Sequence, residues 1–143
     1  LAKRPDLDAE RLDRTRILMN RAVRDCLVTG YEGLVGGIEL PDPDDRHVVA
    51  AAVRCGAQGI VTANLKDFPA AVLGPLGIEA LHPDEFLRDL LGLASGAVVR
   101  VVEQQVQALR NPPMELGDLL NLLEANGLLR STAELRGLLG MGG

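Results

Sequence analysis

The stretch LPDPDDRHVVAAAVRCGAQGIVTANLKDFP, residues 40–69, decides the fold. Acidic residues stand at two points in it, before an alanine-rich segment and just after a short apolar run. The alanine-rich segment 44–56 predicts a helix that ends at Gly56, and the uncharged, β-branched run 58–64 predicts a buried strand. A helix followed closely by a strand is typical of α/β proteins, in which helices cover a parallel sheet.

The flanking sequence extends this alternation. The expected elements are a helix over residues 6–26 with Asp6 or Asp8 as its cap, a strand over 26–31, a loop over 32–44, a turn with a brief helix over 65–77, a strand over 78–83 and a helix that begins at Pro83. Within the central helix, Val48, Ala51, Ala52 and Cys55 form a stripe of small side chains that would lie close to the sheet.

The pattern changes from about residue 94. Three Leu- and Val-rich segments (95–110, 114–126 and 131–139) predict helices with no strand between them. The breaks are expected at residues 111–113 and at Asn126-Gly127, and Ser131 with Glu134 predicts a capping box. We therefore divide the chain into an α/β domain, residues 1–93, and a helical C-terminal extension, residues 94–143.

Composition excludes some functions. The chain has 143 residues, a hydrophobic share of 47%, a net charge of −5 and only three aromatic residues. The negative charge leaves no overall basic field for nucleic acid, and the shortage of aromatic rings argues against binding single strands by base stacking. Cys26 and Cys55 have neither metal-ligand spacing nor a disulfide framework, which favours the reducing cytoplasm. No membrane-length apolar run occurs.

The acidic residues fall where a ligand would bind in a parallel sheet. Helices begin and strands end at the same edge of such a sheet. Asp42, Asp44 and Asp45 stand at a helix start, and Thr62, Asn64 and Asp67 follow a strand. A helix N-terminus stabilises one carboxylate by only ~0.3–1 kcal/mol, so several neighbouring carboxylates need a cation. Mg²⁺ or Mn²⁺ takes such oxygen ligands and activates water for phosphodiester hydrolysis.

Each of these residues also has a structural interpretation. Asp42 with Pro43 can simply form a turn, Asp44 or Asp45 can cap a helix, and Asp67 can cap the turn after the strand. Asn64 can be a left-handed turn residue. His47 can be a surface residue, or it can contact a metal ligand without binding the metal itself. His82 is expected to be structural, and the arginines of the first helix are expected to form a solvated face.

The string DPDDRHVVAAAVRCGAQGIVTANLKDFP resembles the second half of a PIN-domain nuclease. The shared pattern is an aspartate opening an alanine-rich helix, a glycine, a strand ending in Thr-x-Asn, and then Asp-Phe. IEALHPDEFL continues it as the next strand and helix. The likeness is to bacterial PIN proteins akin to VapC toxins, covers roughly residues 25–93, and implies a three-layer parallel sheet flanked by helices.

The resemblance also assigns roles to residues. It implies that the catalytic residues are Asp45, Asp67 and Asn64, that the metal ligands are Asp45, Asp67, Asp42 and Asp44, and that Thr62 and His47 support them. One departure matters. A PIN domain is expected to begin with a strand ending in aspartate, then a helix carrying a second acid, and neither precedes Asp42. We therefore expect a PIN-like chain without about 45 residues of that pattern and without half of the metal ligands.

The sequence thus predicts a Mg²⁺- or Mn²⁺-dependent ribonuclease, the toxin of a toxin–antitoxin pair, with RNA as substrate and an antitoxin as partner. The shortened chain is expected to be inactive alone. Without a central strand the sheet has a gap, which a retained missing segment, a strand exchanged with a second copy or a rearranged sheet must fill. We also expect a homodimer, with the C-terminal helices as its surface. Two alternatives stay open: a phosphotransfer or Toprim-like site at residues 42–44, and a non-catalytic interaction module built on the C-terminal helices.

Overall fold

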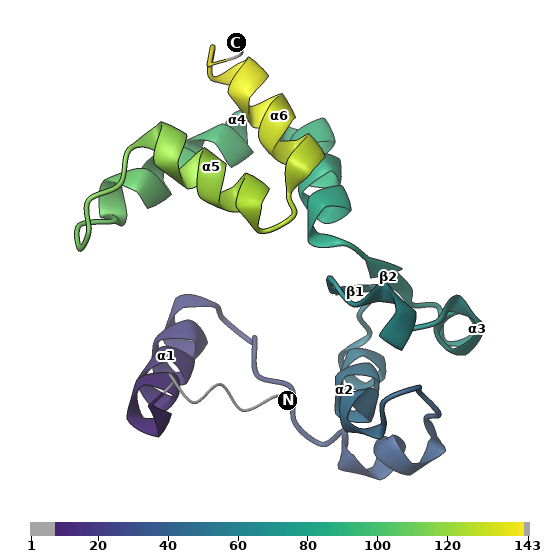
Figure 1. The fold of residues 1–143 in the computed structure, drawn as a ribbon. Helices are drawn as coiled ribbons and strands as arrows, with labels where there is room; N and C mark the ends of the chain where they lie inside the picture. Colours follow the sequence, from purple (N-terminus) through teal and green to yellow (C-terminus); the bar gives the residue numbers. More distant parts are fainter. Residues whose placement is uncertain (1–7, 142–143) are drawn as a thin grey trace. The chain divides into compact units, whose positions relative to one another are not determined.

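The computed structural model describes residues 8–141. They are mostly helical and contain one small sheet (Figure 1). The helices are α1 (Ala9–Ala22), α2 (Arg46–Cys55), α3 (Ala70–Leu73), α4 (Pro83–Ala108), α5 (Leu116–Ala125) and α6 (Leu129–Leu138), and the strands are β1 (Gly59–Val61) and β2 (Glu79–Leu81). Short 3-10 helices lie at Glu32–Gly37, Pro43–Asp45, Leu65–Asp67 and Gly74–Leu76. No helix of this part of the chain is long and apolar enough to cross a membrane.

The chain forms two compact units. The first contains the residues through Ile60 and residues 66–80, and the second contains residues 61–65 and those from Leu81 onward. Helix α4 runs through the position where the sequence suggests a boundary, residues 93/94, but Ala94 itself has the non-helical angles φ −153° and ψ 62°. The boundary at 93/94 stays a prediction.

The core of the first unit lies around α2. Val49 and Ala50 are completely buried and pack with Ile60 of β1 and with Phe68 and Leu73, which follow it. Gly56 ends α2 in the left-handed conformation (φ 71°), as the sequence predicts, because a side chain is disfavoured there. Helix α2 and strand β1 therefore contribute to the same hydrophobic core.

The face that α2 buries differs from the predicted stripe. Val49, Ala50 and Ala52 are buried, whereas Val48 is half-buried and Cys55 is exposed. The prediction followed small side chains, but the buried face also includes Val49, which packs in the hydrophobic cluster of the first unit. Val49 fills the core better than Cys55, since it buries more apolar surface.

The sheet contains only β1 and β2. The Glu79 N–H donates to the Gln58 carbonyl (3.0 Å) and the Thr62 N–H donates to the Leu81 carbonyl (2.9 Å), so both strands run in the same direction. The strands predicted over residues 58–64 and 78–83 are both present in shortened form. The prediction that the first of them is buried is wrong, because only Ile60 of β1 is buried and Val61 is 45% exposed. The predicted three-layer sheet is not present in the described residues.

The predicted strand over residues 26–31 is wrong. These residues form no strand, and Leu27 in their middle is 66% exposed. Asp25, just before them, has a positive φ of 57°, which breaks the extended path. A strand needs a neighbour to receive its backbone hydrogen bonds, and no neighbouring strand for this segment exists in residues 8–141.

The second unit is a helical bundle in which α6 packs against α4 and α5 (Figure 1). Its core contains Leu119 and Leu120 of α5, Leu135 of α6, and Leu91 and Val102 of α4. The predicted breaks are confirmed, because α4 ends at Ala108, α5 ends at Ala125 and Gly127 has a positive φ of 95°.

The predicted capping box of Ser131 and Glu134 is wrong. Helix α6 begins two residues earlier, at Leu129, and Ser131 is completely buried inside it. A capping box does occur one helix earlier, where Glu115 and Asp118 satisfy each other's backbone N–H groups at the start of α5. Tertiary contacts to α4 fix the start of α6 instead.

Asp84 makes those contacts. Its carboxylate accepts hydrogen bonds from the Ser131 hydroxyl (2.6 Å), the Ser131 N–H (2.8 Å) and the Arg130 N–H (3.1 Å). One turn along, Arg88 donates to Glu134 at 2.9 Å. Burial raises the pKa of Asp84, but the hydrogen bonds from Ser131 and Arg130 and the charge of His82 outweigh it and lower the pKa below its usual 3.8. Asp84 thus caps α6 from another helix.

Asp84→Ala is expected to lower the free energy of unfolding at neutral pH by about 1–3 kcal/mol, because the N–H and hydroxyl of buried Ser131 and the Arg130 N–H lose a charged acceptor. Since the folded state lowers the pKa, this stabilisation is present above the unfolded-state pKa and disappears as the pH falls through the folded-state pKa. Urea unfolding at neutral and acidic pH measures it. Asp89→Ala, on the exposed side of α4, is the control, and equal losses in both variants would contradict the capping role.

Candidate functional site

Asp42, Asp44 and Asp45 occupy the turn that leads into α2. The Asp42 carboxylate accepts a hydrogen bond from the Asp44 N–H at 2.9 Å and caps the short 3-10 helix Pro43–Asp45. Asp45 precedes α2 directly, but its side chain makes no capping hydrogen bond. Asp42, rather than Asp44 or Asp45, therefore makes the capping hydrogen bond of this turn. Asp45 is half-buried, and its carboxylate makes no capping hydrogen bond.

Thr62, Asn64 and Asp67 follow β1. The Thr62 hydroxyl oxygen accepts a hydrogen bond from the Asn64 N–H (3.1 Å), which turns the chain away from the strand. The Asn64 side chain is exposed, and Asp67 is half-buried beside the buried Phe68. Helix α3 has Pro69 as its N-cap with no side-chain capping bond, so Asp67 does not cap it.

The two histidines have different surroundings. His47 is exposed in the first turn of α2. His82 caps α4, because its Nδ1 atom accepts a hydrogen bond from the Asp84 N–H at 3.1 Å. The structural role predicted for His82 is confirmed.

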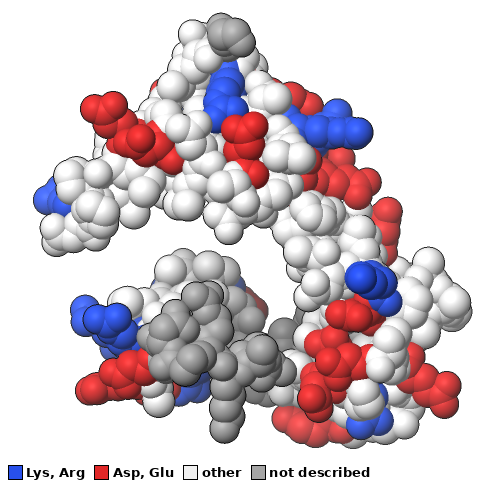
Figure 2. Space-filling model, in the orientation of Figure 1, with Lys and Arg blue, Asp and Glu red and all other residues white. Residues whose placement is uncertain are grey.

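Carboxylate oxygens have the right chemistry for Mg²⁺ or Mn²⁺. Within residues 8–141, however, no three His, Cys, Asp or Glu side chains lie close enough together to hold a metal ion. Figure 2 shows acidic side chains gathered over the part of the chain that contains α2, with few basic ones among them. The described residues therefore offer carboxylates but not a complete ligand set, and the roles assigned to the seven site residues stay predictions.

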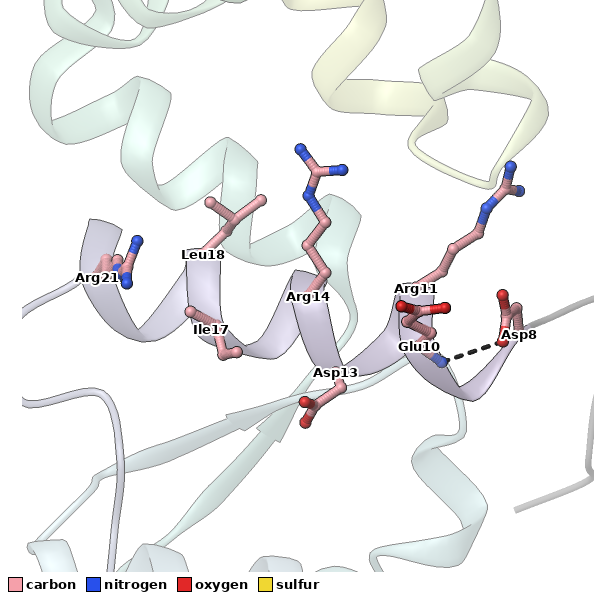
Figure 3. A pocket seen from close by; sticks show the side chains of 8 residues that line it. All are labelled: Asp8, Glu10, Arg11, Asp13, Arg14, Ile17, Leu18 and Arg21. Carbon is pink, nitrogen blue, oxygen red and sulfur yellow. Dashed lines mark hydrogen bonds between the residues drawn. The ribbon is translucent and has the colours of Figure 1, made fainter.

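Two features were not visible in the sequence. The Asp84 cap joins residues 46 and 47 positions apart, so no local pattern reveals it. The other is a groove along α1, lined by both charged and apolar side chains of that one helix (Figure 3). None of the predicted site residues lines it. The sequence analysis interpreted the arginines of this helix as a solvated face, and three of them line the groove.

Fold and site together define an α/β unit with acidic residues before α2, followed by a helical bundle. Residues 83–137 match the family described as VapC50 C-terminal domain. The chain is also 46% identical over 94 residues to a Mycobacterium tuberculosis (strain ATCC 25618 / H37Rv) protein named "Putative ribonuclease VapC50". That match covers 66% of this chain and 55% of the relative. No solved structure matches the chain.

Both matches are to VapC50 proteins, which bears out the resemblance to VapC toxins inferred from the motifs. The family match lies within the second unit and includes most of residues 94–143, which the sequence reasoning treated only as an extension. The chain spans a little over half the length of the relative it matches.

Proposed function

We propose that the protein containing these 143 residues is a metal-dependent endoribonuclease of PIN type that acts as the toxin of a toxin–antitoxin pair. The observation that carries the proposal is the 46% identity to a protein named as a ribonuclease. The Asp-Pro-Asp-Asp turn before α2 supports it, since Asp42 forms the cap and leaves the Asp45 carboxylate for another role.

We assign the hydrolysis of RNA phosphodiester bonds to this protein, with Mg²⁺ or Mn²⁺ as the cofactor. Asp45 and Asp67 are the main metal ligands in this proposal, Asn64 is the third catalytic residue, and Asp42 and Asp44 provide further negative charge. When bound, the metal activates water and shields the charge of the phosphodiester. The proposed partners are an RNA substrate, an antitoxin and a second copy of the chain, and the proposed location is the cytoplasm.

We also propose that the 143 residues alone cleave RNA poorly or not at all. The reason is the ligand count, because no three candidate donors come together in residues 8–141. A single carboxylate or a pair holds Mg²⁺ weakly, since the ion dehydrates reluctantly and needs further oxygen ligands.

An RNA cleavage assay with added Mn²⁺ tests both statements. The 143-residue chain is expected to show little activity, and a longer protein that carries the upstream PIN pattern, a strand ending in aspartate and a helix with a second acid, is expected to cleave RNA. Chelation with EDTA should abolish that cleavage. Metal-independent cleavage would contradict the metal, strong cleavage by the 143 residues would contradict their inactivity, and no cleavage by either would favour the interaction module.

A further inference from the structure

The second unit contains more than the helical bundle. Residues 61–65, which include the turn after β1, belong to the same compact unit as the chain from Leu81 onward. That turn carries Thr62 and Asn64, two of the candidate site residues. The residues that match the VapC50 C-terminal domain, 83–137, therefore share one compact unit with part of the candidate site. The proposed function gives these helices no task of their own.

Hydrogen bonds tie this turn to the last residue of β2. The Thr62 N–H donates to the Leu81 carbonyl at 2.9 Å. The Thr62 hydroxyl oxygen accepts a hydrogen bond from the Asn64 N–H at 3.1 Å. Thr62 is half-buried, whereas Asn64 is exposed. The position of the exposed Asn64 side chain therefore depends on Thr62, and the position of Thr62 depends on Leu81.

The start of α4 follows Leu81 directly and is joined to the start of α6. His82 caps α4, because its Nδ1 atom accepts a hydrogen bond from the Asp84 N–H at 3.1 Å. The Asp84 carboxylate accepts hydrogen bonds from the Ser131 hydroxyl at 2.6 Å, the Ser131 N–H at 2.8 Å and the Arg130 N–H at 3.1 Å. One carboxylate thus connects the first turns of two helices that are distant in the sequence.

The loop between α5 and α6 approaches the same point. A Cβ atom added to Gly127 would lie 3.8 Å from Cε1 of His82, which is van der Waals contact distance. The imidazole of His82 therefore has its own helix on one side and the α5–α6 turn within reach. The bundle consequently holds the residue that directly follows β2.

We propose that Asp84 is a positioning residue for the candidate site. By holding the start of α6 against the start of α4, it fixes His82 and thereby the end of β2. Leu81 then fixes the turn that carries Thr62 and Asn64. The inference rests on the proposed ribonuclease function, since it gives the helical bundle the task of positioning Asn64 for that reaction. It is carried by a continuous series of contacts within one compact unit, which is the physical requirement for coupling between distant residues.

A purely structural role of Asp84 makes a different prediction. If Asp84 only capped α6, its loss would loosen α6 and leave the Thr62 N–H protected. Arg136 offers a matched control within the same bundle. Its guanidinium donates to Glu124 at 2.8 Å and to Asn121 at 2.6 Å, so these contacts join α6 to α5 rather than to α4. Removing them also costs the bundle an interhelical polar contact.

Amide hydrogen exchange, followed by NMR on the 143-residue chain, distinguishes the two roles. Asp84→Asn is expected to accelerate exchange of the Thr62 N–H at least roughly tenfold, because the end of β2 opens more often. Ser131→Ala removes one donor and keeps the carboxylate, so it is expected to give a smaller acceleration and serves if Asp84→Asn unfolds the unit. Arg136→Gln is expected to change the rate at Thr62 less than about twofold. Circular dichroism checks that each variant keeps its helices.

RNA cleavage by the longer protein tests the consequence for the reaction. Asp84→Asn is expected to lower kcat at least roughly tenfold with little change in KM, since a misplacement of about 1 Å can cost ~10²-fold in rate. Thr62→Val breaks the hydrogen bond to Asn64 further along the same series. If Asp84 acts through this turn, the variant with both substitutions loses no more activity than the weaker of the two single variants, because coupled residues are not additive.

Three results would overturn the inference. They are an unchanged exchange rate at Thr62 in Asp84→Asn, an equal acceleration in Arg136→Gln, and losses of kcat that add in the double variant. The exchange measurement needs no RNA cleavage. If the longer protein cleaves no RNA, the proposed function fails, and the exchange rates still decide whether Asp84 holds the turn.

Discussion

Replacing Leu120 with alanine is expected to lower the free energy of unfolding of the second unit by about 2–5 kcal/mol. Leu120 is completely buried in α5, and Leu135 of α6 is buried to the same extent in the same cluster. Truncation removes apolar contacts and leaves a cavity that the surrounding helices close only in part.

Leu122→Ala is the matched control, since Leu122 lies on the same helix and is 48% exposed. Both variants gain the same helix propensity, so the difference between them reports burial alone. Urea unfolding followed by circular dichroism gives the total stability, and hydrogen exchange at α5 and α6 assigns the loss to the second unit. Similar losses in the two variants would mean that Leu120 is not part of a close-packed core.

The residues that were predicted well are those whose structure depends on neighbours in the sequence. Helix α2 and its end at Gly56 follow from a run of helix-forming residues and from the freedom of glycine to adopt a positive φ. The strands β1 and β2 and the start of α4 at Pro83 also follow from local composition. Local signals and the final structure agree at these positions.

The predictions that failed depend on distant parts of the chain. The segment 26–31 has the composition of a strand, but it has no strand beside it in the described residues. Ser131 and Glu134 have the spacing of a capping box, but Asp84 and Arg88 of α4 bind them instead. Sequence patterns report the local preference of a segment and not the partner that finally satisfies its hydrogen bonds.

The same distinction between local and long-range structure applies to the candidate site. The Asp-Pro-Asp-Asp turn and the Thr-x-Asn turn form local hydrogen bonds, and both are present in the structure. A metal site needs several donors close together in space, and residues 8–141 contain no group of three His, Cys, Asp or Glu side chains that could hold an ion. The motifs thus identified which residues to test, and the family comparison supports the kind of reaction to test for.

Asp45→Asn is expected to reduce RNA cleavage by the longer protein roughly a hundredfold or more, which corresponds to about 3 kcal/mol or more in the activation barrier. The change removes one negative charge and keeps the shape of the side chain. Because the Asp45 carboxylate makes no capping hydrogen bond, stability is expected to change little. Cleavage rates at saturating RNA and a urea unfolding curve measure the two effects separately.

Asp42→Ala is the informative comparison, because Asp42 makes a capping hydrogen bond and Asp45 does not. Asp42 caps the turn through the Asp44 N–H, so its loss is expected to cost about 1 kcal/mol of stability and less activity than Asp45→Asn. If the Asp45 carboxylate only stabilised the N-terminus of α2, it would contribute ~0.3–1 kcal/mol to folding stability. Asp45→Asn would then leave RNA cleavage nearly unchanged. Undiminished cleavage by Asp45→Asn would therefore assign Asp45 to the helix and remove it from the proposed active site.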